Sequence, residues 1–141
     1  MWSWTPVATS GFWARRQAHE TSIHRYDAQL AAGRPEPLDG ALAADGIDEL
    51  FEMVPSWPWG GRVRGGGETV HVHCTDRDGE WLLRLVPDGI VVAREHAKAD
   101  VAVRGAASDV LLFLYGRAGR EVLEVFGDVE LLAHFRALMA W

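Results

Sequence analysis

The stretch TVHVHCTDRDGEWLLRLVPDGIVVAREH, residues 69–96, decides the fold because apolar and polar residues alternate along it and short turns interrupt it. Alternation with a period of two is typical of a β-strand with one buried face. In the first segment the apolar face carries Val70, Val72 and Cys74. The turns DRDG and PDG each join two such segments, so the stretch predicts three antiparallel strands.

The sequence on either side of this stretch adds helices and further strands. ADVAVRG predicts a fourth strand and EVLEVFGD a fifth, short one. ASDVLLFLYGR predicts a short apolar helix, and DVELLAHFRALMAW predicts an amphipathic helix that Asp128 caps. Upstream, Asp45 is the predicted cap of a helix with apolar residues at helical spacing. Strands that cluster with helices grouped around them indicate an α+β fold with an antiparallel sheet of about five strands.

The stretch FWARRQAHETSIHRYDAQLAAG, residues 12–33, predicts one long helix before the sheet. Thr9 or Ser10 is the predicted cap, and Gly33, followed by two prolines, ends the helix. Five of the seven tryptophans lie in the first 59 residues. We therefore expect this part of the chain to pack on the rest of the protein or on another molecule.

The 141 residues suit one domain of ordinary size, or a small domain with an appendage. We expect residues 1–40 to form the long helix with its linker, and residues 41–141 to form the α+β domain. A formal net charge of −6 argues against a nucleic-acid partner. The single cysteine cannot form an internal disulfide, and the sequence has neither a secretion signal nor a membrane span, so a cytoplasmic location is expected.

Two residues of the long helix have the spacing of metal ligands. Glu20 and His24 lie one turn apart on one face, and both are competent ligands for zinc. The stretch HETSIH is not the metalloprotease motif, because His19 and His24 are five residues apart and point in different directions. Two ligands do not complete a site. In the alternative without metal, Glu20 pairs with Arg16 and His24 with Asp27 on a solvated helix face.

Other candidates carry less weight. His71 and His73 share one strand face and form a second possible metal pair, although the solvent-exposed face of a half-covered sheet is the more common meaning of this pattern. Cys74 lies with the apolar residues of its strand and is expected to be a buried, inert thiol. His96 stands alone in the sequence and supports no inference.

Several separate blocks resemble one known family. They are WSWTPVATSGFWARRQAHETSIHRYDAQLAAG, ALAADGIDELFEMV, GETVHVHCTDRDGEWLLRLVPDG, REHAKADVAVRGAASDVLLFLYGR and LEVFGD. Together they are similar to the C-terminal part of the mycothiol-dependent maleylpyruvate isomerase family. The resemblance implies that the long helix corresponds to the last helix of a DinB-like metal-binding four-helix bundle. It also implies that the remainder of the chain is a domain similar to sterol carrier proteins.

The resemblance implies a chemistry as well. It assigns Glu20 and His24 to a divalent metal, usually zinc, whose third ligand lies on an earlier helix of the bundle that this sequence does not contain. Mycothiol would supply the nucleophilic thiol, so no catalytic cysteine is required. We expect Arg117 to bind an anionic substrate, because a guanidinium pairs well with a carboxylate. The alternative for Arg117 is a helix-end arginine that bonds to carbonyls.

Three kinds of function are compatible with the sequence. The first is a metal- and mycothiol-dependent isomerase or transferase whose site another chain completes. The second is a non-catalytic sterol-carrier-like module that holds an apolar small molecule between its sheet and the helices. The third is an association domain that forms a homo-oligomer through its N-terminal helix.

Overall fold

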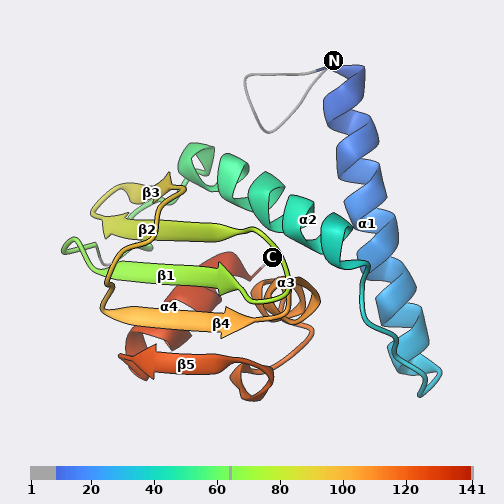
Figure 1. Cartoon of the computed structure of the whole chain (residues 1–141). Coiled ribbons are helices and arrows are strands. Elements are labelled where there is room, and N and C mark those ends of the chain that lie inside the picture. Colours follow the sequence, from blue (N-terminus) through green and yellow to red (C-terminus); the bar gives the residue numbers. More distant parts are fainter. Residues whose placement is uncertain (1–8, 64, 141) are drawn as a thin grey trace.

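The computed structural model of the protein describes residues 9–63 and 65–140 (Figure 1). The helices are α1 (Ser10–Ala31), α2 (Gly40–Met53), α3 (Ala107–Leu114) and α4 (Val129–Met139), with short 3₁₀ turns η1 (Val54–Ser56) and η2 (Arg120–Val122). The strands are β1 (Thr69–Cys74), β2 (Glu80–Val86), β3 (Gly89–Ala93), β4 (Val101–Gly105) and β5 (Glu124–Gly127). This order confirms the predicted α+β fold.

Helix α1 stands at the side of the sheet domain (Figure 1). Thr9 caps it, because its Oγ1 accepts a hydrogen bond from the Phe12 amide at 3.1 Å. Gly33 ends it with a φ of 70°, a conformation that favours glycine. Both ends agree with the prediction. Among the described helices, none combines the length and the apolar character that crossing a membrane requires.

Helix α2 begins at Gly40, earlier than predicted. Its cap is Asp39, whose Oδ1 accepts a hydrogen bond from the Leu42 amide at 2.9 Å. The predicted cap at Asp45 is wrong for two physical reasons. The residues before it, ALAA, are good helix formers, and the Asp45 carboxylate is bonded to α1 instead of to its own helix.

The sheet has five strands in the order β3-β2-β1-β4-β5. Three neighbouring pairs are antiparallel, but β1 and β4 are parallel. The prediction of a purely antiparallel sheet is therefore wrong at this pair. The cause is the connection formed by residues 94–100, which leaves β3 at one edge, crosses β2 and β1, and enters β4 in the direction of β1 (Figure 1).

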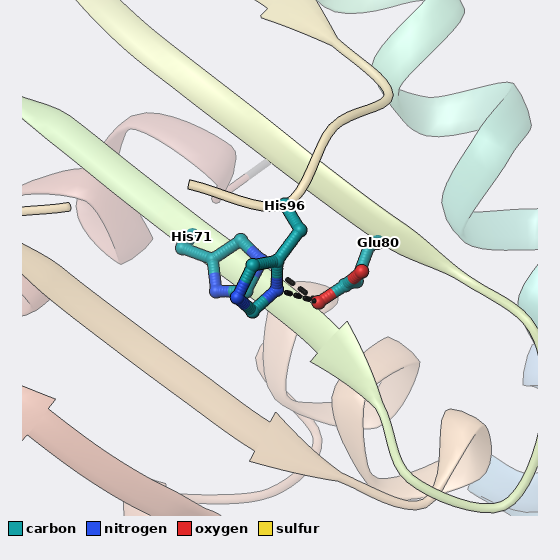
Figure 2. A group of neighbouring side chains, drawn as sticks. All are labelled: His71, Glu80 and His96. Carbon is teal, nitrogen blue, oxygen red and sulfur yellow. Dashed lines mark hydrogen bonds and ion pairs between the residues drawn. The ribbon is translucent and has the colours of Figure 1, made fainter. Parts of the chain in front are cut away.

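The sheet presents two different faces. Helices α3 and α4 cover one face, and the residues of β1 that point into it, Val70, Val72 and Cys74, are at most 1% exposed. The other face carries His71 (Figure 2) and, by the alternation of the strand, His73; the connection of residues 94–100 crosses this face (Figure 1). The first face builds the core, whereas the second face is available for polar chemistry.

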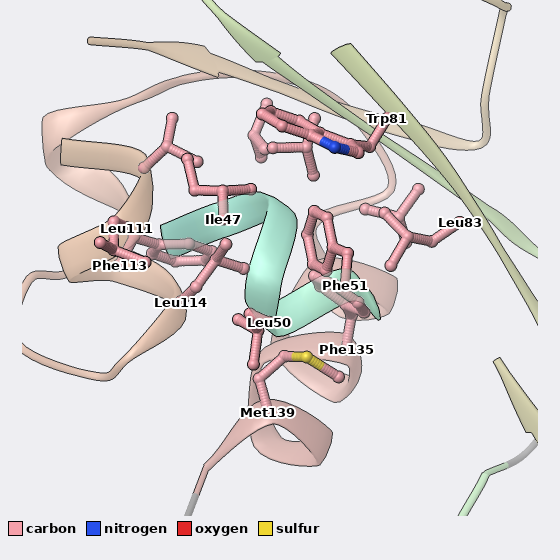
Figure 3. Packing of buried hydrophobic residues seen from close by; sticks show 14 of the residues in the cluster. Ile47, Leu50, Phe51, Trp81, Leu83, Leu111, Phe113, Leu114, Phe135 and Met139 are labelled. Carbon is pink, nitrogen blue, oxygen red and sulfur yellow. The ribbon is translucent and has the colours of Figure 1, made fainter. Parts of the chain in front are cut away.

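The hydrophobic core joins α2, α3 and α4 to the sheet (Figure 3). Leu50 of α2, Leu111 of α3 and Phe135 of α4 are each at most 2% exposed. Burying a side chain of this size stabilises the fold by about 1.5–3 kcal/mol. Helix α1 adds one buried apolar residue, Ile23, so other contacts must hold it in place.

Candidate functional site

Charged residues hold α1 against α2. Arg16 Nη1 donates to Glu49 Oε1 at 3.0 Å, and these residues are only 6% and 2% exposed. Arg15 Nε donates to Asp45 Oδ2 at 2.9 Å, and His19 Nε2 lies 2.7 Å from the same oxygen. Burial raises the pKa of Glu49, although the nearby Arg16 opposes the shift. Helix α1 is therefore anchored by its charged side.

Arg117 joins the end of α3 to α1. Its Nε and Nη2 donate to the two carboxylate oxygens of Asp27 at 3.0 and 2.9 Å, and its Nη1 donates to the Tyr115 carbonyl at 2.8 Å. These bidentate hydrogen bonds lower the pKa of Asp27. Arg117 thus makes the helix-end carbonyl contact of the alternative stated above, together with a fixed carboxylate contact across to α1.

Glu20 and His24 lie side by side on α1, next to this ion pair. Glu20 Oε2 is 3.3 Å from His24 Nε2, while Glu20 Oε1 accepts a hydrogen bond from Arg16 at 2.8 Å. His24 Nδ1 is 3.4 Å from Asp27 Oδ2. The contacts to Arg16 and Asp27 are those of the alternative without metal. A carboxylate behind the far ring nitrogen is also the arrangement that orients a metal-bound histidine.

The pair has the geometry of two metal ligands but lacks a third. Ligands 2.0–2.2 Å from a tetrahedral zinc lie roughly 3.3 Å apart, which is the separation of Glu20 Oε2 and His24 Nε2. Within residues 9–63 and 65–140, the one group of three candidate ligand atoms lies elsewhere, on the sheet. Glu20 and His24 therefore fit a metal as half of a site.

The three site residues predicted from the sequence come together in space. A hollow of about 180 Å³ between α1 and the end of α3 is lined by Arg16, Glu20, Ile23, His24, Tyr115 and Arg117. The side chains of Glu20 and His24 are 47% and 66% exposed, so a ligand or another chain has access to them. The hollow joins the half metal site to the arginine.

A second cluster lies on the sheet face opposite α3 and α4. His71 comes from β1, Glu80 from the start of β2, and His96 from the connection between β3 and β4 (Figure 2). Glu80 Oε1 is 2.6 Å from His96 Nδ1, 3.3 Å from His71 Nε2 and 3.3 Å from His73 Nδ1. One carboxylate oxygen therefore faces three imidazole rings.

His71 is buried, contrary to the expectation that it lies on a solvent-exposed sheet face. It is 5% exposed, and the ring of His96 packs edge-on against it with 5.3 Å between the ring centres. The prediction fails because residues 94–100 cross this face (Figure 1). Burial lowers the pKa of His71, which favours the neutral imidazole. His73 stays half-exposed, as expected for an open face.

Glu80 and His96 were not candidates in the sequence. The position of Glu80 could have been predicted from the short turn between β1 and β2. That turn sets the register in which His73 pairs with Glu80, and this register places both side chains on one face. For His96 the local sequence carries no such signal. Its position depends on the path of the crossover between β3 and β4.

Cys74 is not part of either cluster. The residue is 1% exposed on the core face of β1, and burial raises its pKa to about 12. The thiol is therefore protonated near neutral pH and shielded from reagents, in agreement with the predicted inert cysteine.

The space predicted for an apolar ligand, between the sheet and the helices, holds packed core side chains. Phe113, Leu132 and Phe135 are each at most 2% exposed there. A hollow of about 520 Å³ lies instead at the surface, between the end of α3 and α4. Its lining consists of Leu114, Tyr115, Gly116, Arg117, Ala133, Arg136, Ala137 and Ala140.

Solved structures of low identity share this fold. The UbiJ-SCP2 ubiquinone synthesis protein is 23% identical with a TM-score of 0.52, over 70% of this chain and 94% of that protein. The stereoselective inverting sec-alkylsulfatase Pisa1 from Pseudomonas sp. is 17% identical with a TM-score of 0.56, over 67% of this chain but only 16% of the sulfatase. Such identities show the fold alone, here one of the sterol-carrier type.

Comparison with sequences gives one match and one negative result. The chain matches no curated protein. The family model described as the MDMPI C-terminal domain matches residues 41–134, which is well over half of the chain. The match covers α2, the whole sheet and α3, and most of it coincides with the sterol-carrier-like part of the fold. The chain belongs to the MDMPI C-terminal domain family, where MDMPI stands for mycothiol-dependent maleylpyruvate isomerase.

Proposed function

We propose that the chain is part of a metal- and mycothiol-dependent isomerase or transferase in which Glu20 and His24 bind a divalent metal, zinc being the expected ion. The observation that carries the proposal is the 3.3 Å separation of Glu20 Oε2 and His24 Nε2 on the helix before the family domain. Membership of the family supports the thiol cofactor. In this proposal residues 1–40 carry the ligands, and residues 41–141 position them.

Asp27 and Arg117 act behind the two ligands. Asp27 bonds His24 Nδ1 and so leaves Nε2 directed toward Glu20. Arg117 fixes Asp27 through two hydrogen bonds. In this arrangement Arg117 is a positioning residue. The anion-binding role expected of Arg117 requires a substrate carboxylate to replace Asp27, because Nε, Nη1 and Nη2 are all engaged.

The thiol must come from the cofactor. A bound divalent metal would stabilise the cofactor thiolate that adds to a conjugated double bond of the substrate. The chain supplies no equivalent nucleophile, since burial raises the pKa of Cys74 to about 12. Its own contribution is to orient His24 through Asp27 and to leave the exposed side of Glu20 accessible from the hollow.

Among the described residues of one chain, no third candidate ligand atom joins Glu20 and His24, so the third ligand must come from elsewhere. We propose that a second copy of the chain associates through α1, or that another segment of a longer protein packs there. The exposed apolar positions of α1 support a partner on this helix, since Leu30 is 47% exposed and Phe12 and Trp13 are only half-buried. Light scattering tests the association, with a dimer expected.

Metal content per chain, measured by elemental analysis after purification without chelator, tests the metal site. The double variant Glu20→Gln, His24→Ala should lose the metal. The matched control is Gln17→Ala, Thr21→Ala, a pair with the same spacing at exposed positions of the same helix, which should retain it. Equal metal content in the two variants would contradict the proposal.

The cluster of His71, Glu80 and His96 could bind metal too and so contribute to the metal content per chain. Each comparison is therefore repeated in a background that carries Glu80→Gln and His96→Ala. Metal that persists in the background and disappears with Glu20→Gln and His24→Ala belongs to α1. A background without any metal would show that α1 binds none.

A second candidate function rests on the hollow beside α4. Its volume of about 520 Å³ lies within the range of small-molecule pockets, and its alanines make one wall apolar. In this alternative the chain is a non-catalytic module that holds an apolar molecule with an anionic end near Arg117 and Arg136. Titration with a fluorescent fatty acid tests it. Binding that Ala137→Trp abolishes by filling the hollow would support this function, and no binding to the unmodified chain would reject it.

A further inference from the structure

We propose that His71, Glu80 and His96 form a binding site for a divalent transition metal of the zinc class, separate from the half site on α1. The three ligand atoms come from β1, from the start of β2 and from the β3–β4 connection, and all lie within 4.8 Å of one another (Figure 2). His73, whose Nδ1 lies 3.3 Å from Glu80 Oε1, borders the group as a possible fourth ligand.

The distances suit a tetrahedral ion after small side-chain movements. Ligand atoms around zinc lie roughly 3.3 Å apart, and His71 Nε2 and Glu80 Oε1 already have a separation of 3.3 Å. His96 Nδ1, at 2.6 Å from the same oxygen, must move outward by less than about 1 Å to reach that spacing. The His96 side chain is 77% exposed, so it is free to make this movement.

The buried imidazole of His71 points to a ligand independently of the spacing. The residue is 5% exposed, and its Nε2 faces the cluster without a hydrogen bond of good geometry among the described residues. A buried polar atom without a hydrogen bond costs about 1–3 kcal/mol. A metal bound to this nitrogen would remove that cost. The neutral form of the ring, which burial favours, is the form that binds a metal.

The choice of ligand atoms selects the class of ion. Two or three imidazoles with one carboxylate suit zinc and similar transition metals, whereas calcium and magnesium prefer oxygen ligands. Two strand arginines share this face: Arg104, which pairs in register with His73 on the parallel strand β4, and Arg84, which pairs with Thr69 on β2. Arg104 Nη1 lies 3.7 Å from Glu124 Oε2, which partly compensates its charge.

A metal here would fasten the crossover connection to the sheet. Two ligands belong to adjacent strands, and the third belongs to residues 94–100, the segment that sets the parallel pairing of β1 and β4. The ion would thus link three segments that are separate in sequence. Three protein ligands would also leave a coordination position for water or a small anion if His73 stays outside the shell.

Zinc titration against a chelating dye, followed by NMR of the histidine ring nitrogens, tests the site. We expect one zinc per chain at this site, counted apart from any zinc held by α1, with shifts of the His71 Nε2 and His96 Nδ1 signals. Glu80→Gln and His96→Ala should each weaken binding by more than about tenfold, since loss of an outer-shell partner alone costs about 10–100-fold. These two positions avoid the risk that a change at buried His71 prevents folding.

Matched variants separate this site from α1. The double variant Glu20→Gln, His24→Ala should leave the His71 and His96 shifts unchanged. This expectation holds whether or not α1 binds a metal. His134→Ala controls for the loss of one histidine elsewhere. The proposal is overturned if the unmodified chain binds no zinc at micromolar concentration with its His71 and His96 signals unmoved, or if binding at these residues survives both Glu80→Gln and His96→Ala.

Discussion

Replacing Arg16 by methionine should destabilise the protein, because it leaves a buried carboxylate of α2 without its ion-pair partner. Arg16 Nη1 donates to Glu49 Oε1 at 3.0 Å, and the two side chains are 8% and 2% exposed. Removing one partner of a buried ion pair costs about 3–5 kcal/mol, because the other charge stays buried and unpaired. His19 Nε2 lies 3.1 Å from Glu49 Oε2 but is hydrogen-bonded to Asp45, so Glu49 would keep no hydrogen bond among the described residues. We therefore expect a loss of about 3 kcal/mol in the free energy of unfolding.

A double-mutant cycle isolates the pair. The double variant Arg16→Met, Glu49→Leu removes both charges and replaces them by apolar side chains, a change that is often nearly neutral. We expect it to be more stable than Arg16→Met alone, with a coupling energy of about 2 kcal/mol. Urea unfolding measures both values, provided that the dependence of the free energy on urea stays the same.

The control is Arg15→Met, one residue earlier. Arg15 also pairs with carboxylates of α2, but its side chain is 30% exposed, so its loss should cost less than about 1 kcal/mol. Equal effects of the two single changes would refute the claim that α1 is anchored by a buried charge. A double variant less stable than the summed effects of Arg16→Met and Glu49→Leu would also contradict a stabilising pair.

Three further predictions concern the site and the core. The Arg117 guanidinium lowers the pKa of Asp27, so the stability from this pair is present above the ordinary aspartate pKa and is lost as the pH falls through the folded pKa. Arg117→Met should therefore return the Asp27 pKa toward 3.8, measured by NMR titration of the carboxyl group. An unchanged Asp27 pKa would show that Arg117 does not lower it. Phe135→Ala should cost about 3–5 kcal/mol, because the ring is fully buried, and calorimetry that shows less than 1 kcal/mol would contradict the described packing. Asp48→Ala removes the acceptor 2.8 Å from the Trp81 indole Nε1 and should cost about 1–3 kcal/mol in urea unfolding, whereas an unchanged midpoint would argue against this bond.

Local patterns predicted much of the fold. The alternation in residues 69–96 predicted the first three strands, because period-two burial is a property of each strand by itself. The ends of α1 followed from Thr9 and Gly33 for the same local reason. The parallel pairing of β1 and β4 was not predictable in this way, since it depends on the path of the crossover.

Only part of the candidate site could be predicted from local sequence. Glu20 and His24 were identified from their spacing on one helix, a local property. The bond from Arg117 to Asp27 joins residues 90 positions apart, so it depends on how α1 packs beside α3. The burial of His71 likewise depends on a distant segment. The role of Arg117 and the burial of His71 therefore depend on contacts between separate elements, which residue spacing does not reveal.

The NMR signals of the His24 ring nitrogens during zinc titration show whether Glu20 and His24 of α1 bind a metal. We expect the Nε2 signal of His24 to shift as zinc is added, while Nδ1 keeps its hydrogen bond to Asp27, and we expect Glu20→Gln to abolish the shift. If the His24 signals stay unchanged in the assembled protein while zinc binds elsewhere, then Glu20 and His24 are a surface pair and the proposed metal site on α1 is wrong.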